Sequence, residues 1–139
     1  MLVLRASSIH GVGIFTTRPI AKGEHVRLWQ EGDYRFVTFA ESDNDPELRE
    51  VREIYCVKDG TGYHCPADFH RMSIGWYMNH SDTPNVRSSA AEGWEYFATR
   101  AIAAGEEIVC DYTALTPYES APDGNSPSTP PGRADRSAR

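Results

Sequence analysis

Seven residues, NHSDTPN at 79–85, form a polar segment that directly follows the apolar run IGWYM. His80, Ser81 and Asp82 have the residue types of a hydrolase triad, but adjacent residues cannot converge their side chains on one point. His80 and Asp82 also lack partners at the spacing that metal ligands usually show. Asn79-His80-Ser81 fits the N-glycosylation pattern, although the N-terminal residues have no apolar core of signal-peptide length. This segment alone therefore favours an Asx-type turn with satisfied side chains.

Glycine and cysteine residues elsewhere offer further chemistry. Gly11 and Gly13, in the segment GVG, allow a ligand to approach the backbone closely because they carry no Cβ, although a plain hairpin turn is the commoner explanation. Three cysteines, Cys56, Cys65 and Cys110, show no CxxC spacing, and their odd number argues against a disulfide framework. These cysteines predict a reducing, cytoplasmic setting, and a nuclear one is left open.

The composition limits the class of protein and of partner. The 139 residues suit one domain, and 40% hydrophobic with 24% charged residues is typical of soluble globular proteins. No stretch approaches the roughly 20 apolar residues of a membrane span, so no membrane association is predicted. The formal charge of −6 disfavours direct nucleic-acid binding and favours basic partners.

The segment from residue 116 onward is rich in proline and small polar residues, and it holds five of the nine prolines. Because it is nearly devoid of apolar residues, it predicts a disordered tail at 119–139 after one ordered domain at 1–118. Three acidic residues and three arginines balance within the tail, so the ordered domain carries the whole charge of −6.

Short β-strands dominate the predicted secondary structure, because brief runs of β-branched and aromatic residues alternate with Gly, Asp and Asn. The expected strands are 2–4, 13–15, 25–29, 34–39, 54–57, 94–99 and 107–112. A helix is expected at 46–54, capped by Asp45 and opened by Pro46, and a helical turn at 69–78. The similar segments FTTRPIAKGEHV and FATRAIAAGEEI, from Phe15 and Phe97, each predict a chain reversal that uses a glycine.

Four segments, in their order along the chain, resemble the SET-domain lysine methyltransferases. GVG with the following IFTTRPIAKGE is similar to the family's opening glycine motif, and YMNHSDTPN to its Asn-His-Ser and Pro-Asn motif. YFATRAIAAGEEIVCDY is similar to the closing motif, and YCVKDGTGYHCPADF sits where the family has a Tyr-bearing strand. The resemblance covers about residues 3–113. It implies a mainly β fold with short helices, made of several small sheets, and a C-terminal pseudoknot at which buried polar groups must find partners.

The activity implied by the resemblance is methyl transfer from S-adenosylmethionine to a lysine side chain of a protein, through a narrow channel. The implied cofactor-binding residues are Gly11, Val12, Gly13, Tyr77, Asn79, His80 and Tyr112. Tyr112 matches the closing tyrosine and is expected to orient the target amine. Tyr55 is the second candidate catalytic residue, although core packing explains it equally well. Tyr118 is a candidate to fold over the adenine, and a basic protein or peptide with the target lysine is the implied partner.

Departures from the family pattern are informative. Trp76 stands where the family often has an arginine, so the partner of the cofactor carboxylate is not identified. Cys110 is smaller than the aromatic residue that the family often has there, and it is expected to border the substrate channel and to leave room for dimethyl or trimethyl product. No metal site is expected, because His64, Cys65 and His70 meet no familiar ligand spacing. The alternative is a catalytically silent SET-fold module that binds a partner protein.

Overall fold

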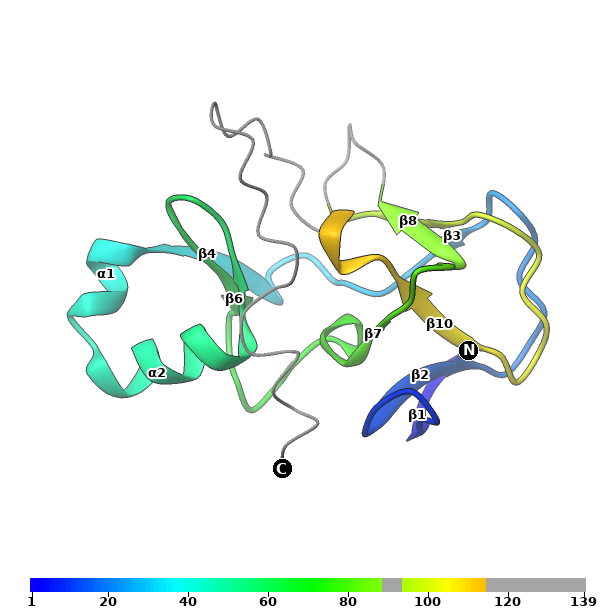
Figure 1. Ribbon diagram of the computed structural model, residues 1–139, viewed down its shortest axis with the longest axis horizontal. Helices are drawn as coiled ribbons and strands as arrows, with labels where there is room; N and C mark the ends of the chain where they lie inside the picture. Colours follow the sequence, from blue (N-terminus) through cyan, green and yellow to red (C-terminus); the bar gives the residue numbers. More distant parts are fainter. Residues whose placement is uncertain (89–93, 115–139) are drawn as a thin grey trace.

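The computed structural model describes residues 1–88 and 94–114. Tyr118 and the predicted tail at 119–139 lie outside these residues. The described chain forms three small β-sheets, two short α-helices and two 3₁₀ turns (Figure 1). Within the described ranges, no helix has the length and apolar character needed to cross a membrane. The predicted fold class, mainly β with short helices, is confirmed.

The first sheet joins the two ends of the described chain. Its strands lie in the order β1 (Leu2–Ala6), β2 (Val12–Thr16), β10 (Glu107–Cys110) and β7 (Asn79–His80). Strand β2 pairs antiparallel with both β1 and β10, whereas β10 pairs parallel with β7. The sheet therefore places the polar segment that begins with β7 directly beside β10.

Two further sheets complete the described chain. The second contains, in order, β3 (His25–Val26), β9 (Tyr96–Ala98) and β8 (Val86–Ser88). The third contains β4 (Tyr34–Thr38), β6 (Gly62–Pro66) and β5 (Val57–Lys58), with the helices α1 (Phe39–Asp43) and α2 (Pro46–Tyr55). The 3₁₀ turns are η1 (Ile74–Tyr77) and η2 (Tyr112–Ala114). Figure 1 shows the third sheet and its helices at one end of the molecule and the first sheet at the other.

Capping signals explain where both α-helices begin. The Thr38 hydroxyl accepts from the Glu41 N–H, and the Glu41 carboxylate accepts from the Thr38 N–H, which together form a capping box. The Asp45 carboxylate accepts from the Leu48 N–H at 3.1 Å, and Pro46 occupies the first turn of α2. The predicted helix at 46–54 is confirmed. Helix α1 is missed, because the apolar pattern of the preceding strand runs into its first residue.

The two similar segments fold as chain reversals, as predicted, and the structure also pairs them with each other. Ile20 and Ile102 exchange backbone hydrogen bonds at 2.8 and 2.9 Å. Gly23 and Gly105 adopt positive φ angles of 82° and 86°, which residues with a Cβ tolerate poorly. Each of these glycine N–H groups donates to a strand residue of the other segment at 2.8 Å. The reversals therefore hold each other in place next to the ends of β2 and β10.

Most predicted strands are confirmed with shifted ends, but the strand at 54–57 is wrong. Helix α2 continues to Tyr55, and a strand begins only at Val57. The capped helix propagates through these residues and overrides their β-propensity. The strand predicted at 107–112 ends at Cys110, and Tyr112 begins η2 instead. Strands β6, β7 and β8 are missed, because β7 and β8 are very short and β6 follows a glycine-rich turn.

The hydrophobic core has two parts. The larger part is centred on the first two sheets and includes Ile14, Met78, Ile108 and Cys110, none more than 2% exposed. A smaller second core belongs to the third sheet and its helices. Its buried members are Val37, Cys56, Tyr63 and Cys65.

Candidate functional site

Strands β7 and β10 bring two motif segments into contact. In their parallel pairing, Asn79 lies opposite Val109 and His80 lies opposite Cys110. The N–H of Ser81 extends the contact by donating to Cys110 O at 2.9 Å. The Asn-His-Ser segment and the closing motif, distant in the sequence, therefore lie side by side.

Tyr112 is attached to the Asn-His-Ser segment through its backbone and its hydroxyl group. Its N–H donates to His80 Nδ1 at 3.0 Å, and its hydroxyl donates to Met78 O at 2.6 Å. The ring centroids of His80 and Tyr112 are 5.2 Å apart. Because Nδ1 accepts a hydrogen bond, the neutral His80 ring carries its proton on Nε2, which lies 3.0 Å from Asp82 Oδ1. Two partners thus fix the orientation and the tautomer of His80.

The Asn79 side chain fastens the glycine loop to strand β10. Asn79 is 7% exposed, and its Nδ2 donates to His10 O at 3.0 Å and to Val12 O at 3.3 Å. The same nitrogen lies 2.8 Å from Glu107 Oε1. Asn79 is predicted to bind the cofactor, and the structure gives its side chain the task of positioning the loop that contains Gly11 and Val12.

Glu107 is a site residue that the sequence interpretation misses. Its carboxylate accepts from Asn79 Nδ2 and, at 2.8 Å, from the Ser7 hydroxyl. A Cβ on Gly13 would lie 2.0 Å from Glu107 Oε1, so only glycine fits there without displacing the carboxylate. Gly13 is predicted to let the cofactor approach the backbone. In the structure, the space that a Cβ on Gly13 would take is occupied by the Glu107 carboxylate. Glu107 could have been found from the sequence, because it is the last residue of the Gly-Glu-Glu motif. No sequence pattern identifies Ser7.

Asn85, the last residue of the motif, explains why a second asparagine follows the turn. Asn85 is 1% exposed, its Nδ2 donates to Glu107 O at 2.7 Å, and its Oδ1 accepts from the Val109 N–H at 2.9 Å. Its own N–H donates to Val109 O at 3.1 Å. Both ends of the amide are therefore satisfied by β10, as a buried amide requires.

The tip of the glycine loop is open. Gly11 has a φ of 46°, and a Cβ built on it would meet nothing within 4 Å. Val12 is 46% exposed and Ile9 is 52% exposed. The loop therefore presents backbone and apolar side chains to the surface. On its inner side, the carbonyl groups of His10 and Val12 accept hydrogen bonds from Asn79.

Asp111 is a negative group beside His80. The Thr113 hydroxyl and N–H donate to Asp111 Oδ1 at 2.7 and 2.9 Å. These two bonds, with a smaller contribution from His80, hold the pKa of Asp111 below its ordinary value. Because its pKa is lowered, Asp111 is ionised at neutral pH. Its carboxylate lies 3.8 Å from His80 Nδ1.

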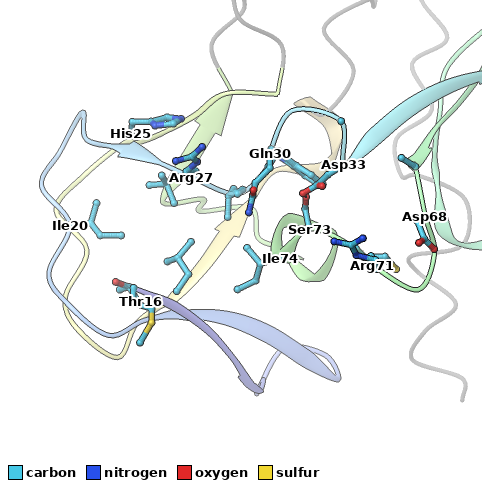
Figure 2. A pocket seen from close by; sticks show the side chains of 18 of the residues that line it. Thr16, Ile20, His25, Arg27, Gln30, Asp33, Asp68, Arg71, Ser73 and Ile74 are labelled. Atoms are coloured by element: carbon cyan, nitrogen blue, oxygen red, sulfur yellow. The ribbon is translucent and has the colours of Figure 1, made fainter.

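A hollow of about 830 Å³ lies elsewhere, between the ends of β2 and β3 and the start of η1 (Figure 2). Its lining residues include Arg27, and Figure 2 shows Thr16 toward one end of it and Ser73 and Asp33 toward the other. A second hollow, of about 680 Å³, lies among α1, α2, β5 and β6. Neither is lined by a residue predicted to bind the cofactor.

The three residues weighed as metal ligands have other contacts. His64 Nε2 lies 2.9 Å from Asp59 Oδ2, and His70 Nδ1 lies 3.4 Å from Asp68 Oδ1. Cys65 is buried in the second core. In the described part of the chain, no group of three or more His, Cys, Asp or Glu residues could hold a metal ion.

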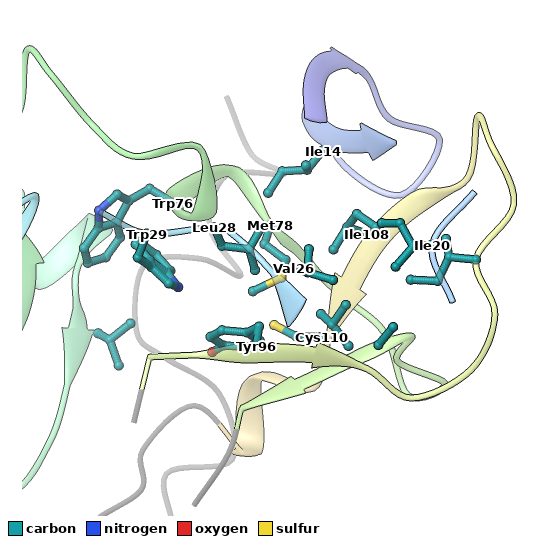
Figure 3. Packing of buried hydrophobic residues seen from close by; sticks show 14 residues of the cluster. Ile14, Ile20, Val26, Leu28, Trp29, Trp76, Met78, Tyr96, Ile108 and Cys110 are labelled. Atoms are coloured by element: carbon teal, nitrogen blue, oxygen red, sulfur yellow. The ribbon is translucent and has the colours of Figure 1, made fainter. Parts of the chain in front are cut away.

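The remaining predicted residues lie in different surroundings. Tyr77 belongs to η1 and packs, half-buried, against the larger core. Cys110 is 2% exposed and lies in that core beside Tyr96 (Figure 3), so a role in the substrate channel stays a prediction. Tyr55 ends α2 rather than lying in a strand, and its catalytic role also stays a prediction.

Trp76, which stands at the position where an arginine is expected, is packed in a buried aromatic cluster. It is 1% exposed, and its ring lies edge-on to Trp29 with centroids 5.0 Å apart. The Trp94 ring is 5.9 Å away. An arginine in these apolar surroundings would need a buried counter-ion. The aromatic cluster therefore accounts for the departure.

Comparison with known proteins decides the family. The family model described as the SET domain matches residues 11–113. The chain belongs to the SET domain family. Among solved structures, this SET domain is similar to a Plasmodium falciparum protein described as a candidate histone methyltransferase, with 21% identity and a TM-score of 0.53 over 80% of this chain and 91% of that chain.

A second similar structure is an apo form of ctPRC2 with two substitutions in Ezh2, at 23% identity and a TM-score of 0.58. That match covers 81% of this SET domain but 15% of the other chain. No curated protein matches the sequence. At these identities the structural matches show the SET fold alone, so activity and substrate require a separate argument.

Proposed function

We propose that this SET domain is an S-adenosylmethionine-dependent methyltransferase that acts on a lysine side chain of a protein. The observation that carries the proposal is the meeting of the glycine loop, the Asn79–His80 segment and Tyr112 through direct hydrogen bonds. The resemblance assigns cofactor binding to all three, and they come from three distant parts of the sequence. We also propose that the parallel contact of β7 with β10 is part of the pseudoknot expected for the family.

The glycine loop and the segment beside it fit the proposed cofactor. The tip at Gly11 is open, and the exposed Val12 offers apolar surface. Asn79 and Glu107 hold this loop in one position from behind, so little ordering remains to be done on binding. Gly11, Val12, Asn79 and His80 would hold the cofactor, which supplies a methyl group on a positively charged sulfur that is a good leaving group.

Tyr112 would orient the target amine. Its hydroxyl is held by Met78 O and its backbone by His80, so the phenol oxygen has a fixed position from which to meet an amine N–H. Alignment of reacting groups in this way is worth roughly 7–11 kcal/mol of the barrier. A tyrosine pKa of about 10 makes the phenol a poor general base at neutral pH, so its proposed role is position and polarisation. The lysine must lose its proton before reaction, which desolvation at the site favours.

The proposed substrate is a basic protein or peptide that carries the target lysine. The net charge of −6 favours association with a positively charged segment. Acidic residues also gather around α1 and α2, where Glu41, Asp43, Glu47 and Glu50 accompany the helix caps. These charges raise the rate of encounter with a Lys- and Arg-rich segment, and the effect falls with salt.

A transfer assay with labelled S-adenosylmethionine, a panel of basic peptides and a native lysate tests the proposal. Label should appear in lysine, and Tyr112→Phe should reduce transfer by at least tenfold. Tyr34→Phe, a half-buried tyrosine of the aromatic cluster, is the matched control and should retain transfer. Full activity of Tyr112→Phe would remove the role assigned to that residue.

The second candidate function is a catalytically silent module that binds a partner protein. The observation that favours it is Trp76, which occupies the arginine position and leaves the cofactor carboxylate without an identified partner. Calorimetric titration with S-adenosylmethionine separates the two. Measurable binding supports the enzyme, whereas a folded protein that binds no cofactor supports the silent module.

A further inference from the structure

Cys56 and Cys65 lie together in the second core, where each is 1% exposed. Strands β5 and β6 pair Val57 with His64 and Lys58 with Tyr63. The same register, carried back by one residue, places Cys56 directly opposite Cys65. Cys56 is the C-cap of α2, and its backbone is already extended, with φ −97° and ψ 163°. The pair therefore sits across two neighbouring extended segments.

The register also fixes the type of pair. The Asp59 N–H donates to Gly62 O at 3.0 Å and closes the turn between the strands. Hydrogen-bonded and non-hydrogen-bonded pairs alternate along an antiparallel ladder, so the cysteines, three steps from that bond, occupy a non-hydrogen-bonded position. Facing Cα atoms there are about 4.5 Å apart, inside the roughly 4.4–6.8 Å range that a disulfide spans. Neither cysteine forms a disulfide in this structure.

Arg52 provides a positive charge near the Cys65 sulfur. It is 4% exposed, and its Nη1 donates to Ser42 Oγ at 3.1 Å. Its Nε has no hydrogen-bond partner among the described residues. A buried guanidinium needs a nearby anion, since an uncompensated buried charge is strongly destabilising. A thiolate in this cluster would provide that anion.

Cys65 is the better nucleophile of the pair. A hydrogen bond from Cys56 is the main cause that lowers the pKa of Cys65 to about 7, with burial opposing it and the charges of Arg52 and Arg35 adding to it. The lowered pKa makes Cys65 the sulfur of this pair that ionises more readily, and the thiolate is the form that reacts with peroxides. Cys110 lies in the other core and is not part of this cluster.

We propose that Cys56 and Cys65 are an oxidisable pair that closes to an intramolecular disulfide when a peroxide reaches it. The Cys65 thiolate attacks one peroxide oxygen, so that an S–O bond forms, the O–O bond breaks and hydroxide leaves. The Cys56 sulfur then attacks the Cys65 sulfur, the S–S bond forms, and the hydroxyl group leaves with the thiol proton as water. Overall, the two thiols lose two electrons and the peroxide is reduced to two molecules of water.

The site is independent of the proposed methyl transfer. It joins the end of α2 to β6 in the third sheet, whereas the glycine loop joins β1 to β2 in the first sheet and Tyr112 begins η2 after β10. Closure of the disulfide requires no cofactor and no substrate. Its test therefore gives the same answer whether or not the chain transfers methyl groups.

The experiment is intact-mass analysis of the folded full-length protein before and after hydrogen peroxide, with alkylation of the remaining thiols. The expected result is a loss of about 2 Da, which dithiothreitol reverses, and one unalkylated pair that maps to Cys56 and Cys65. Cys110→Ser should lose the same mass. Cys56→Ser should not, and should instead gain one oxygen on Cys65.

Two results would overturn the proposal. One is a folded wild-type protein that keeps both thiols alkylatable at a peroxide concentration that oxidises the unfolded chain. The other is a disulfide that maps to Cys110 or joins two molecules. If Cys56→Ser does not fold, the peptide map of the wild-type protein decides the matter alone.

Discussion

The backbone N–H of Tyr112 donates to Nδ1 of His80 at 3.0 Å, and this bond joins the closing motif to the Asn-His-Ser segment. The phenol hydroxyl of Tyr112 adds a second attachment at Met78 O. The histidine thus has a structural task that is separate from any contact of its backbone with a ligand. With this geometry His80 positions Tyr112. Replacing His80 should therefore lower both the free energy of unfolding and the rate of the proposed methyl transfer.

Replacing His80 with alanine should lower the free energy of unfolding by about 1–3 kcal/mol, because the Tyr112 N–H loses its acceptor. Urea unfolding of His80→Ala and of wild type measures the difference. The control is Asp82→Asn, since the Asp82 side chain is 98% exposed and should contribute little to stability. An unchanged midpoint in His80→Ala would show that the bond to Tyr112 does not hold the closing motif against the Asn-His-Ser segment.

Alanine at Gly13 should disturb the site more than alanine at Gly11. A methyl group at Gly13 would lie 2.0 Å from Glu107 Oε1, so the carboxylate must move and release Asn79, at a cost of about 1–3 kcal/mol. A methyl group at Gly11 meets nothing within 4 Å and adds only the strain of a φ of 46°, about 1–2 kcal/mol.

Thermal unfolding and S-adenosylmethionine binding of the two glycine variants test this difference. Gly13→Ala should lose cofactor affinity because Asn79 and Glu107 no longer fix the loop, whereas Gly11→Ala should leave those two residues in place and lose affinity only through its own Cβ at the open tip. Equal cofactor affinity in Gly13→Ala and wild type would contradict the positioning role given to Glu107.

One tyrosine should titrate unusually late. Burial, together with a hydrogen bond to Glu53, raises the pKa of Tyr63 to about 12. Because the folded-state pKa is raised, the associated stability is fully present below the ordinary tyrosine value of about 10 and is lost as pH rises through about 12. Absorbance at alkaline pH, with Tyr63→Phe subtracted from wild type, isolates this group. A difference curve centred near the ordinary value would refute the environment described for Tyr63.

The product of the proposed reaction should carry two or three methyl groups. Cys110 is smaller than the aromatic residue expected at its position, so a channel that it bordered would have room for a methylated amine to rotate and react again. Mass spectrometry of a methylated peptide after long incubation measures the product. Strictly monomethylated lysine would remove the role proposed for Cys110, which would then be a core residue only.

Much of the fold could be predicted from the sequence, because its signals are local. Asp45 and Pro46 mark the start of α2, and Gly23 and Gly105 mark the two reversals. The contacts of the site could not be predicted in the same way. The bond of Asn79 to the carboxylate of Glu107 depends on the parallel contact of β7 with β10, which no spacing along the chain reveals.

The error at Tyr55 has a similar cause. The run IYCV has the β-branched and aromatic residues of a strand, but the helix that begins about two turns earlier, at Pro46, continues through its first two residues. At Trp76 the sequence alone shows that the expected arginine is absent. It does not show why a tryptophan stands there. Only the packing of Trp29 and Trp94 around it explains why an arginine is absent.

The most direct test of the account is an amide NMR titration of the full-length protein with S-adenosylhomocysteine, the demethylated form of the proposed cofactor. The account predicts saturable shifts at Gly11, Val12, Asn79, His80 and Tyr112. It predicts no such shifts at Arg27, Asp33 or Ser73, which border the hollow of about 830 Å³. Shifts confined to that hollow, or none at all in the folded protein, would contradict a cofactor site at the meeting of the glycine loop with the Asn-His-Ser segment.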